Sequence, residues 1–139
     1  MSNQDLVLNF ASADGSYTVT FEDNGKVAYA YLKKDGIITS AVWLYNRCAT
    51  PDIAEWSDRR NIPFANCEGY MTPEGRILEP IGSQDVLVDW DYENGMPVAY
   101  ICIFEDLCGV LDSQSRVGFA RFAAKNSPIA QVMEIAEDA

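Results

Sequence analysis

Apolar and polar residues alternate along the first third of the chain, which is the pattern of half-buried β-strands. In "SYTVTFE", Tyr17, Val19 and Phe21 alternate with Ser, Thr or Glu. Turn sequences that contain Asn-Gly or Asp-Gly separate such segments and supply the positive φ angles of tight hairpins. The predicted strands are 6–11, 16–22, 26–33 and 37–46, with turns at 23–25 and 34–36. Residues 6–46 are therefore predicted to form an antiparallel meander.

A second alternating region begins at residue 85 and is predicted to form a second meander over 85–123. Its strands are 85–92, 97–104, 107–112 and 116–123, and "ENGM" supplies another Asn-Gly turn. The first of these strands has two distinct faces. One is apolar and predicted to be buried, with Val86, Val88, Trp90 and Tyr92; the other holds Leu87, Asp89 and Asp91. This strand is therefore predicted to line a core and to present two carboxylates to solvent.

The segment 47–83 between the meanders has little periodicity and holds four of the six prolines. One short helix is predicted there, with Thr50 as N-cap and Pro51 at its first position. The rest is predicted to be an irregular connection that covers the core. A second helix is predicted over 128–138, because apolar residues recur at helical spacing: Ile129, Val132, Met133 and Ala136.

Together these elements predict a single α+β domain over residues 1–139. Its mainly antiparallel β meanders form either one strongly twisted sheet or two packed sheets, with the C-terminal amphipathic helix on one face. An all-β barrel with a peripheral helix is the alternative. The segments 21–32 and 90–103 share an Asn-Gly turn followed by "VAY", as in a weak internal repeat. The demands of the hairpin turn explain the same likeness without a repeat.

Four stretches carry a resemblance to a known family: "FEDNGKVAYAY", "WLYN", "VDWDYENG" and "GVLDSQSRVGFAR". Outside residues 47–83 the chain resembles a family of small uncharacterised bacterial proteins. In that family a Phe-Glu-Asp turn leads an aromatic strand, and a later Trp-containing hairpin precedes an apolar-Asp-Gly-Arg segment. The resemblance implies a bacterial origin and a compact β-rich domain. Because the family has no assigned activity, the resemblance assigns no functional residue.

Acidic residues outnumber Lys and Arg by 21 to 10, for a formal net charge of −11. The excess is concentrated in residues 77–115, which hold eight carboxylates and no Lys or Arg. Such a charge disfavours nucleic acid and anionic membranes as partners, because both bind clustered bases, and it favours a basic protein. The first residues lack a secretory-signal pattern, and the longest apolar run, 97–104, is far shorter than a membrane helix. A cytosolic location is therefore expected.

The side-chain inventory excludes several kinds of chemistry. The chain has no His, no glycine-rich phosphate-binding pattern and no Gly-x-Ser-x-Gly elbow. Its four cysteines have no Cys-x-x-Cys spacing, so free thiols are expected and a zinc site is not. "DWDYENG" fails the EF-hand pattern, because the sixth residue from Asp89 is Asn94 where Gly is required. A looser cation site built from Asp89, Asp91 and a distant carboxylate is the alternative to the prediction of no metal and no cofactor.

Two groups of residues are candidates for binding. The first is predicted to face a protein partner and consists of Asp89, Asp91 and Glu93; the same carboxylates would also suit a merely solvated strand face. The second would line a small-molecule pocket under segment 47–83 and consists of Trp43, Arg47, Trp56, Arg59 and Arg60, with Phe64 and Tyr70 as further aromatic lining. Guanidinium groups near Cys48 would lower the pKa of its thiol or bind an anionic ligand, although pairing with nearby acids is the simplest interpretation.

These observations support three hypotheses about function. The first, and our prediction, is a non-catalytic cytosolic binding protein with an acidic face, such as an inhibitor or immunity protein for a basic bacterial protein. The second is a β-rich domain that binds a small molecule in an aromatic pocket under segment 47–83. The third is an enzyme that uses carboxylates and Arg without His. It has the least support, because no carboxylate pair stands out beyond Asp89 and Asp91.

Overall fold

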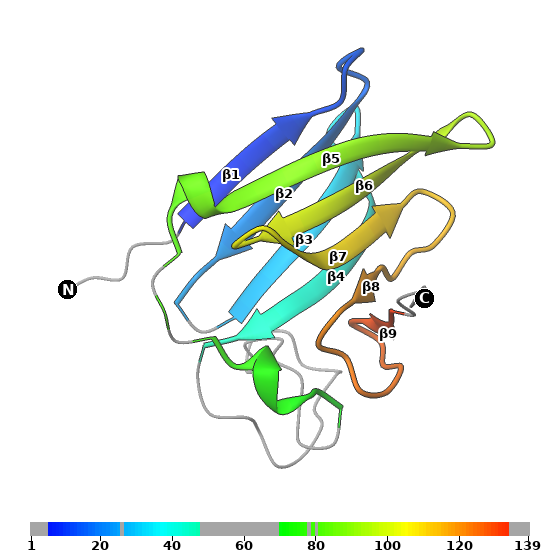
Figure 1. Cartoon of the computed structure of the whole chain (residues 1–139). Coiled ribbons are helices and arrows are strands. Elements are labelled where there is room, and N and C mark those ends of the chain that lie inside the picture. The colour runs from blue at the N-terminus through cyan, green and yellow to red at the C-terminus, as the bar shows by residue number, and fades with distance from the viewer. Residues whose placement is uncertain (1–5, 26, 48–69, 78, 80, 134–139) are drawn as a thin grey trace.

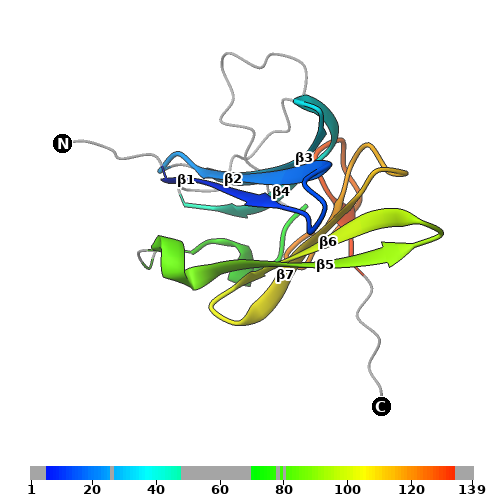
Figure 2. The same cartoon turned by 90° about the horizontal axis from the view of Figure 1, so that it is seen from above.

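The computed structural model describes residues 6–25, 27–47, 70–77, 79 and 81–133 (Figure 1). Within these residues the chain forms two β-sheets and two short 3-10 turns, and no α-helix. Figure 2 shows the two sheets stacked in layers, and Figure 1 shows that the strand axes of the two sheets are broadly aligned. The architecture is therefore a β-sandwich.

The first sheet is an antiparallel meander whose four strands are neighbours in chain order. They are β1 (Leu6–Ala11), β2 (Tyr17–Asp23), β3 (Val27–Lys34) and β4 (Ile37–Asn46). Asp35 and Gly36 both adopt positive φ in the β3–β4 turn, as their turn sequence predicts. Alternating side chains of β2, β3 and β4 are fully buried in the core; they include Val19, Phe21, Leu32, Val42 and Leu44.

The second sheet has five strands, of which only the last pair is parallel. They are β5 (Val86–Glu93), β6 (Met96–Ile103), β7 (Asp106–Asp112), β8 (Phe119–Ala120) and β9 (Gln131–Val132). Asn94 and Gly95 form the β5–β6 turn at positive φ. Two 3-10 turns precede β5: η1 (Pro73–Gly75) and η2 (Ser83–Asp85). Ile101 and Leu111 bring fully buried side chains from this sheet into the common core.

One side of the sandwich is closed by backbone hydrogen bonds between β4 and residues 116–118, a junction that we call the seam. The Ala41 N–H donates to the Arg116 carbonyl at 3.0 Å, and the Gly118 N–H donates to the Ala41 carbonyl at 2.8 Å. The backbone is tightly packed here, because a Cβ atom added to Gly118 would lie 2.5 Å from the carbonyl oxygen of Val110. Gly118 is therefore required by space rather than by its φ angle.

The opposite side of the sandwich is bounded by β1 and β5, which are the edge strands of their sheets. Leu8 and Phe10 of β1 are partly buried against the core, and so are Val88 and Trp90 of β5. Half-exposed side chains of the two edge strands therefore cover this side of the core.

The sequence pattern located most of the strands. Seven predicted strands, from 6–11 to 107–112, are confirmed to within one residue at each end. Of the two predicted arrangements, one strongly twisted sheet or two packed sheets, the structure has the second. The predicted strand 116–123 is too long, since only Phe119–Ala120 pairs with β7 while Arg116 and Gly118 bond to β4. The α+β class is wrong for the described residues, which are all-β.

The C-terminal helix predicted over 128–138 is wrong where the structure describes it. The backbone of this segment bonds to the sheets instead: the Trp43 N–H donates to the Ile129 carbonyl, and the Gln131 N–H donates to the Gly118 carbonyl. Ala130 is buried and Val132 is exposed, the reverse of what the helical stripe predicts. Residues 134–139 lie outside the described residues, as does the short helix predicted after Thr50.

Candidate functional site

The outer face of β5 carries the three carboxylates that the sequence singled out. Asp89, Asp91 and Glu93 are all exposed, and the intervening Val88 and Trp90 pack against the core. The predicted alternation therefore holds over most of the strand. It fails at Tyr92, whose side chain is 48% exposed because β5 runs past the end of the core.

The residues opposite these carboxylates in the sheet are apolar. Asp89 pairs with Tyr100 of β6, which in turn pairs with Val110 of β7, and Leu87 pairs with Cys102. Paired residues project on the same face of a sheet. We call Leu87, Tyr100, Cys102 and Val110 the apolar stripe; Leu87 is 57% exposed and the other three are half-buried.

Carboxylates flank the apolar stripe. Asp112 of β7 lies on the same face as Asp91, since both pair with Val98 of β6. We call Asp89, Asp91, Glu93 and Asp112 the acidic rim. The stripe and the rim together form what we call the outer face of the second sheet, which Figure 2 shows on the side turned away from the first sheet.

Carboxylates of the acidic rim contribute to raised pKa values of two groups on the outer face. The pKa of Tyr100 is raised by partial burial and then by the charges of Glu93, Asp91 and Asp112. The pKa of the Cys102 thiol is raised by burial and then by Asp89 and Asp106. No carboxylate of the rim forms an ion pair with a base in the described part of the chain. The outer face therefore carries an uncompensated negative potential over apolar side chains.

Charge is divided unequally between the two sheets. Residues 77–115, which form β5 to β7 and their connections, hold eight carboxylates and no Lys or Arg. Residues 6–46, which form the first sheet, hold four carboxylates and three lysines. The negative charge of the described molecule is thus concentrated on the second sheet.

The residues predicted to line a pocket under segment 47–83 are only partly described, and those described differ in burial. Trp43 is fully buried, and its indole N–H donates to Asn46 Oδ1 at 2.7 Å. Tyr70 is half-buried, and the Lys125 ammonium lies 5.3 Å from its ring centre. The remaining predicted members, Trp56, Arg59, Arg60 and Phe64, lie outside the described residues, as does Cys48.

Arg47 belongs to a buried polar cluster that the sequence did not reveal. One of its Nη atoms lies 3.4 Å from Asp23 Oδ2, which also accepts a 2.7 Å hydrogen bond from the Tyr45 hydroxyl. The other oxygen of Asp23 accepts the Gly25 N–H. Burial, followed by the charge of Asp23, raises the pKa of Tyr45 far above its ordinary value. The other Nη of Arg47 donates to the Glu79 carbonyl at 3.2 Å, whereas the Nη near Asp23 has no hydrogen bond within the described residues. These contacts give the cluster a structural role at the ends of β2 and β4.

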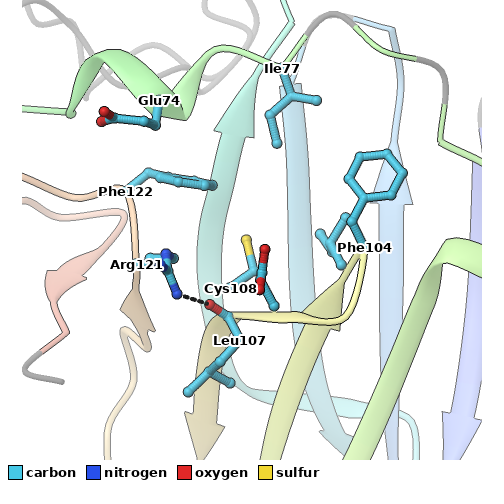
Figure 3. A pocket seen from close by; sticks show the side chains of 9 residues that line it. Glu74, Ile77, Phe104, Leu107, Cys108, Arg121 and Phe122 are labelled. Atoms are coloured by element: carbon cyan, nitrogen blue, oxygen red, sulfur yellow. Dashed lines mark hydrogen bonds between the residues drawn. The ribbon is translucent and has the colours of Figure 1, made fainter. Parts of the chain in front are cut away.

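A cavity of about 280 Å³ opens between η1, the β6–β7 turn and the chain beyond β8 (Figure 3). Its apolar lining consists of Ile77, Ile103, Phe104, Leu107, Cys108 and Phe122. Glu74, Asp106 and Arg121 complete the lining. One signal for this site is present in the sequence: the residues between β6 and β7 are Phe104 and Glu105, whereas those between β5 and β6 are Asn94 and Gly95.

The thiol in this cavity is shielded from solvent. Cys108 is buried, and burial raises the pKa of its thiol to about 12, although the charge of Arg121 opposes this. At neutral pH the group is a protonated, apolar part of the wall.

Two findings on the structure and one on its relation to known proteins complete the description of the site. Within the described residues no three His, Cys, Asp or Glu side chains gather as metal ligands. The part of the chain that the structure describes has no helix of the length and apolarity needed to cross a membrane. No family model, no curated protein and no solved structure matches the chain, so the resemblance to a bacterial family stays a prediction.

Proposed function

We propose that the protein is a non-catalytic cytosolic binding protein that holds a basic protein partner against the outer face of its second sheet. The observation that carries the proposal is the acidic rim around an exposed apolar stripe, with no base among the residues of β5, β6 and β7. Within this class, an inhibitor or immunity protein would act by covering a basic functional surface of its partner.

The two components of the outer face suit different tasks in binding. Clustered carboxylates without counter-charges attract a basic protein over distance and speed its encounter. They contribute nothing to folding, because neighbouring like charges repel. The apolar stripe supplies area that is favourable to bury, and Tyr100 at its centre is of the residue type most enriched at energetically dominant contact positions.

The experiment begins with isolation of the partner on immobilised protein at low salt, followed by measurement of binding kinetics with the purified partner. Changing Asp89→Asn together with Asp91→Asn is expected to slow association by about tenfold at low salt and to flatten its salt dependence. Tyr100→Ala is expected to speed dissociation instead, since it removes contact area rather than charge.

A matched control alters the same amount of charge on the first sheet. Glu22→Gln together with Asp35→Asn is expected to leave association nearly unchanged. The double variant Asp89→Asn, Asp91→Asn should leave the free energy of unfolding unchanged or slightly raised. Trp90→Ala removes a partly buried indole and should lower the free energy of unfolding by about 1–2 kcal/mol. The proposal is wrong if the captured partner is not basic, or if the two charge variants behave alike.

A further inference from the structure

We propose that the cavity between η1 and the β6–β7 turn binds a small molecule composed of one aromatic ring and a positively charged amine. The cavity reaches the core residues Ile103 and Cys108, and its lining shares no residue with the apolar stripe or the acidic rim. The inference therefore does not depend on the proposed protein partner.

The volume of the cavity suits a ligand with a single aromatic ring. Its volume is about 280 Å³, while an apolar cavity of roughly 150 Å³ is enough to bind benzene. One ring with a short aliphatic chain fits that space. The wall is suited to such a ring, since Figure 3 shows Phe104 and Phe122 on opposite sides of the cavity and Ile77 between them.

The charged residues of the cavity select the polar end of the ligand. Asp106 contributes a carboxylate and Arg121 a guanidinium to the lining, and Glu74 lines the cavity with its carboxylate turned away from the interior in Figure 3. That guanidinium already donates to the Leu107 carbonyl at 3.4 Å, as Figure 3 shows. Glu105, which lies between Phe104 and Asp106 in the chain, adds a further carboxylate beside the cavity-lining residues. A ligand amine is therefore favoured over a ligand carboxylate.

The β6–β7 turn carries an aromatic residue in a conformation that does not suit one. Phe104 has φ 54° and Glu105 has φ 72°, in the left-handed region at both central positions. The equivalent positions of the β5–β6 turn are Asn94 and Gly95, with φ of 54° and 80°. Asn-Gly is the favoured pair for this turn, and a bulky residue there is strained.

The strained position places an aromatic side chain where folding gains little from it. Phe104 is 41% exposed and lines the cavity. A chain that uses Asn-Gly in the neighbouring turn would be more stable with Asn-Gly here too. Strain of this kind is concentrated at binding sites, and here it accounts for an aromatic ring held at the opening to pack on a ligand ring.

The test uses 2-phenylethylamine as the probe, titrated into the full-length protein and followed by amide chemical shifts. We expect saturable shifts at residues of the cavity, and affinity for 3-phenylpropionate, of similar size and opposite charge, at least tenfold weaker. Changing Glu74→Gln with Asp106→Asn should remove most of that difference. Absence of saturable binding by the amine, or tighter binding of the carboxylate, would overturn the proposal.

Two variants of the turn separate binding from folding. Phe104→Asn with Glu105→Gly is expected to raise the melting temperature and to weaken binding of 2-phenylethylamine at least tenfold. Glu105→Gly alone relieves part of the strain but keeps the ring, so it should retain most of the affinity. If the double variant binds as tightly as the wild type, Phe104 is not a ligand contact and the assignment fails. The Asp89→Asn, Asp91→Asn protein should bind the probe as the wild type does.

Discussion

Asp23 shows how a single buried carboxylate is accommodated in this core. It is 6% exposed, and its two oxygens accept hydrogen bonds from Tyr45 and Gly25, with Arg47 close enough for an ion pair. A buried charge without such partners would cost several kcal/mol. The arrangement ties the end of β2 to the end of β4, across the strand that lies between them.

Removal of one hydroxyl tests this cluster. Tyr45→Phe is expected to lower the free energy of unfolding by about 1–3 kcal/mol, because Asp23 loses a donor that buried solvent does not replace. The folded state raises the pKa of Tyr45, so the unfolded chain loses this proton first. Stability of the wild type should therefore decline as pH rises above about 10.

Denaturant unfolding between pH 7 and 11 measures both effects. Above pH 10 the free energy of unfolding of Tyr45→Phe should decline less than that of the wild type. Tyr92→Phe is the control, since Tyr92 is exposed and its hydroxyl forms no hydrogen bond with any described residue. Equal alkaline profiles for wild type and Tyr45→Phe would contradict the role assigned to Tyr45.

Cysteine reactivity provides a second prediction for single residues. The pKa of Cys108 is raised from 9.0 to about 12, so its thiolate fraction at pH 8 is lower by about a thousandfold than that of an ordinary thiol. Cys102 is only partly buried and has a smaller upward shift. Iodoacetamide labelling followed by peptide mass spectrometry should modify Cys102 before Cys108, which should react only after unfolding. Early labelling of Cys108 in the folded protein would contradict the packed wall described above.

Strands were easier to predict from the sequence than the way in which they meet. Alternation and Asn-Gly turns identified β1 to β7, because both signals are local to a few residues. The same local information failed for 128–133, where apolar spacing typical of a helix occurs in a segment that bonds to β4 and β8. Whether a short amphipathic segment becomes helix or strand depends on which backbone groups are nearby, and the sequence pattern does not contain that information.

The candidate sites show the same difference between local sequence signals and contacts between distant parts of the chain. Exposure of Asp89 and Asp91 follows from strand periodicity and was predicted. Their apolar neighbours were not, because the pairing with Tyr100 depends on the register of β5 and β6. The cavity was missed because Glu74, Asp106 and Arg121 come from three separate parts of the chain.

The seam provides the prediction at the scale of elements. Gly118→Ala is expected to cost about 1–3 kcal/mol, because the added Cβ would meet the Val110 carbonyl at 2.5 Å and backbone atoms have little room to move. Gly82→Ala is the matched control, since the nearest atoms there belong to the end of the flexible Gln84 side chain. Chemical denaturation of the two variants makes the comparison, and equal stabilities would contradict a tightly packed seam.

On the scale of the whole molecule, the two sheets have different properties although they share one core. The first sheet has nearly balanced charge, and the second sheet carries the acidic excess. Concentration of charge on one layer gives the molecule a preferred orientation toward a basic surface, which an evenly spread charge of the same size would not. The cavity lies at one end of the sandwich, so a partner on the outer face and a ligand in the cavity could be bound together.

The seam also has a consequence for the order of events in folding. Within each meander, β1 to β4 and β5 to β7, every strand pairs with the strand that precedes or follows it in the chain. Both meanders are therefore assembled from contacts between residues close in sequence, which form early. The bonds between Ala41 and residues 116–118 close a much longer loop, whose entropy must be lost before the contact contributes. The junction is then expected to form late, after the rate-limiting step. In that case the cost of Gly118→Ala appears as faster unfolding, with the refolding rate almost unaltered.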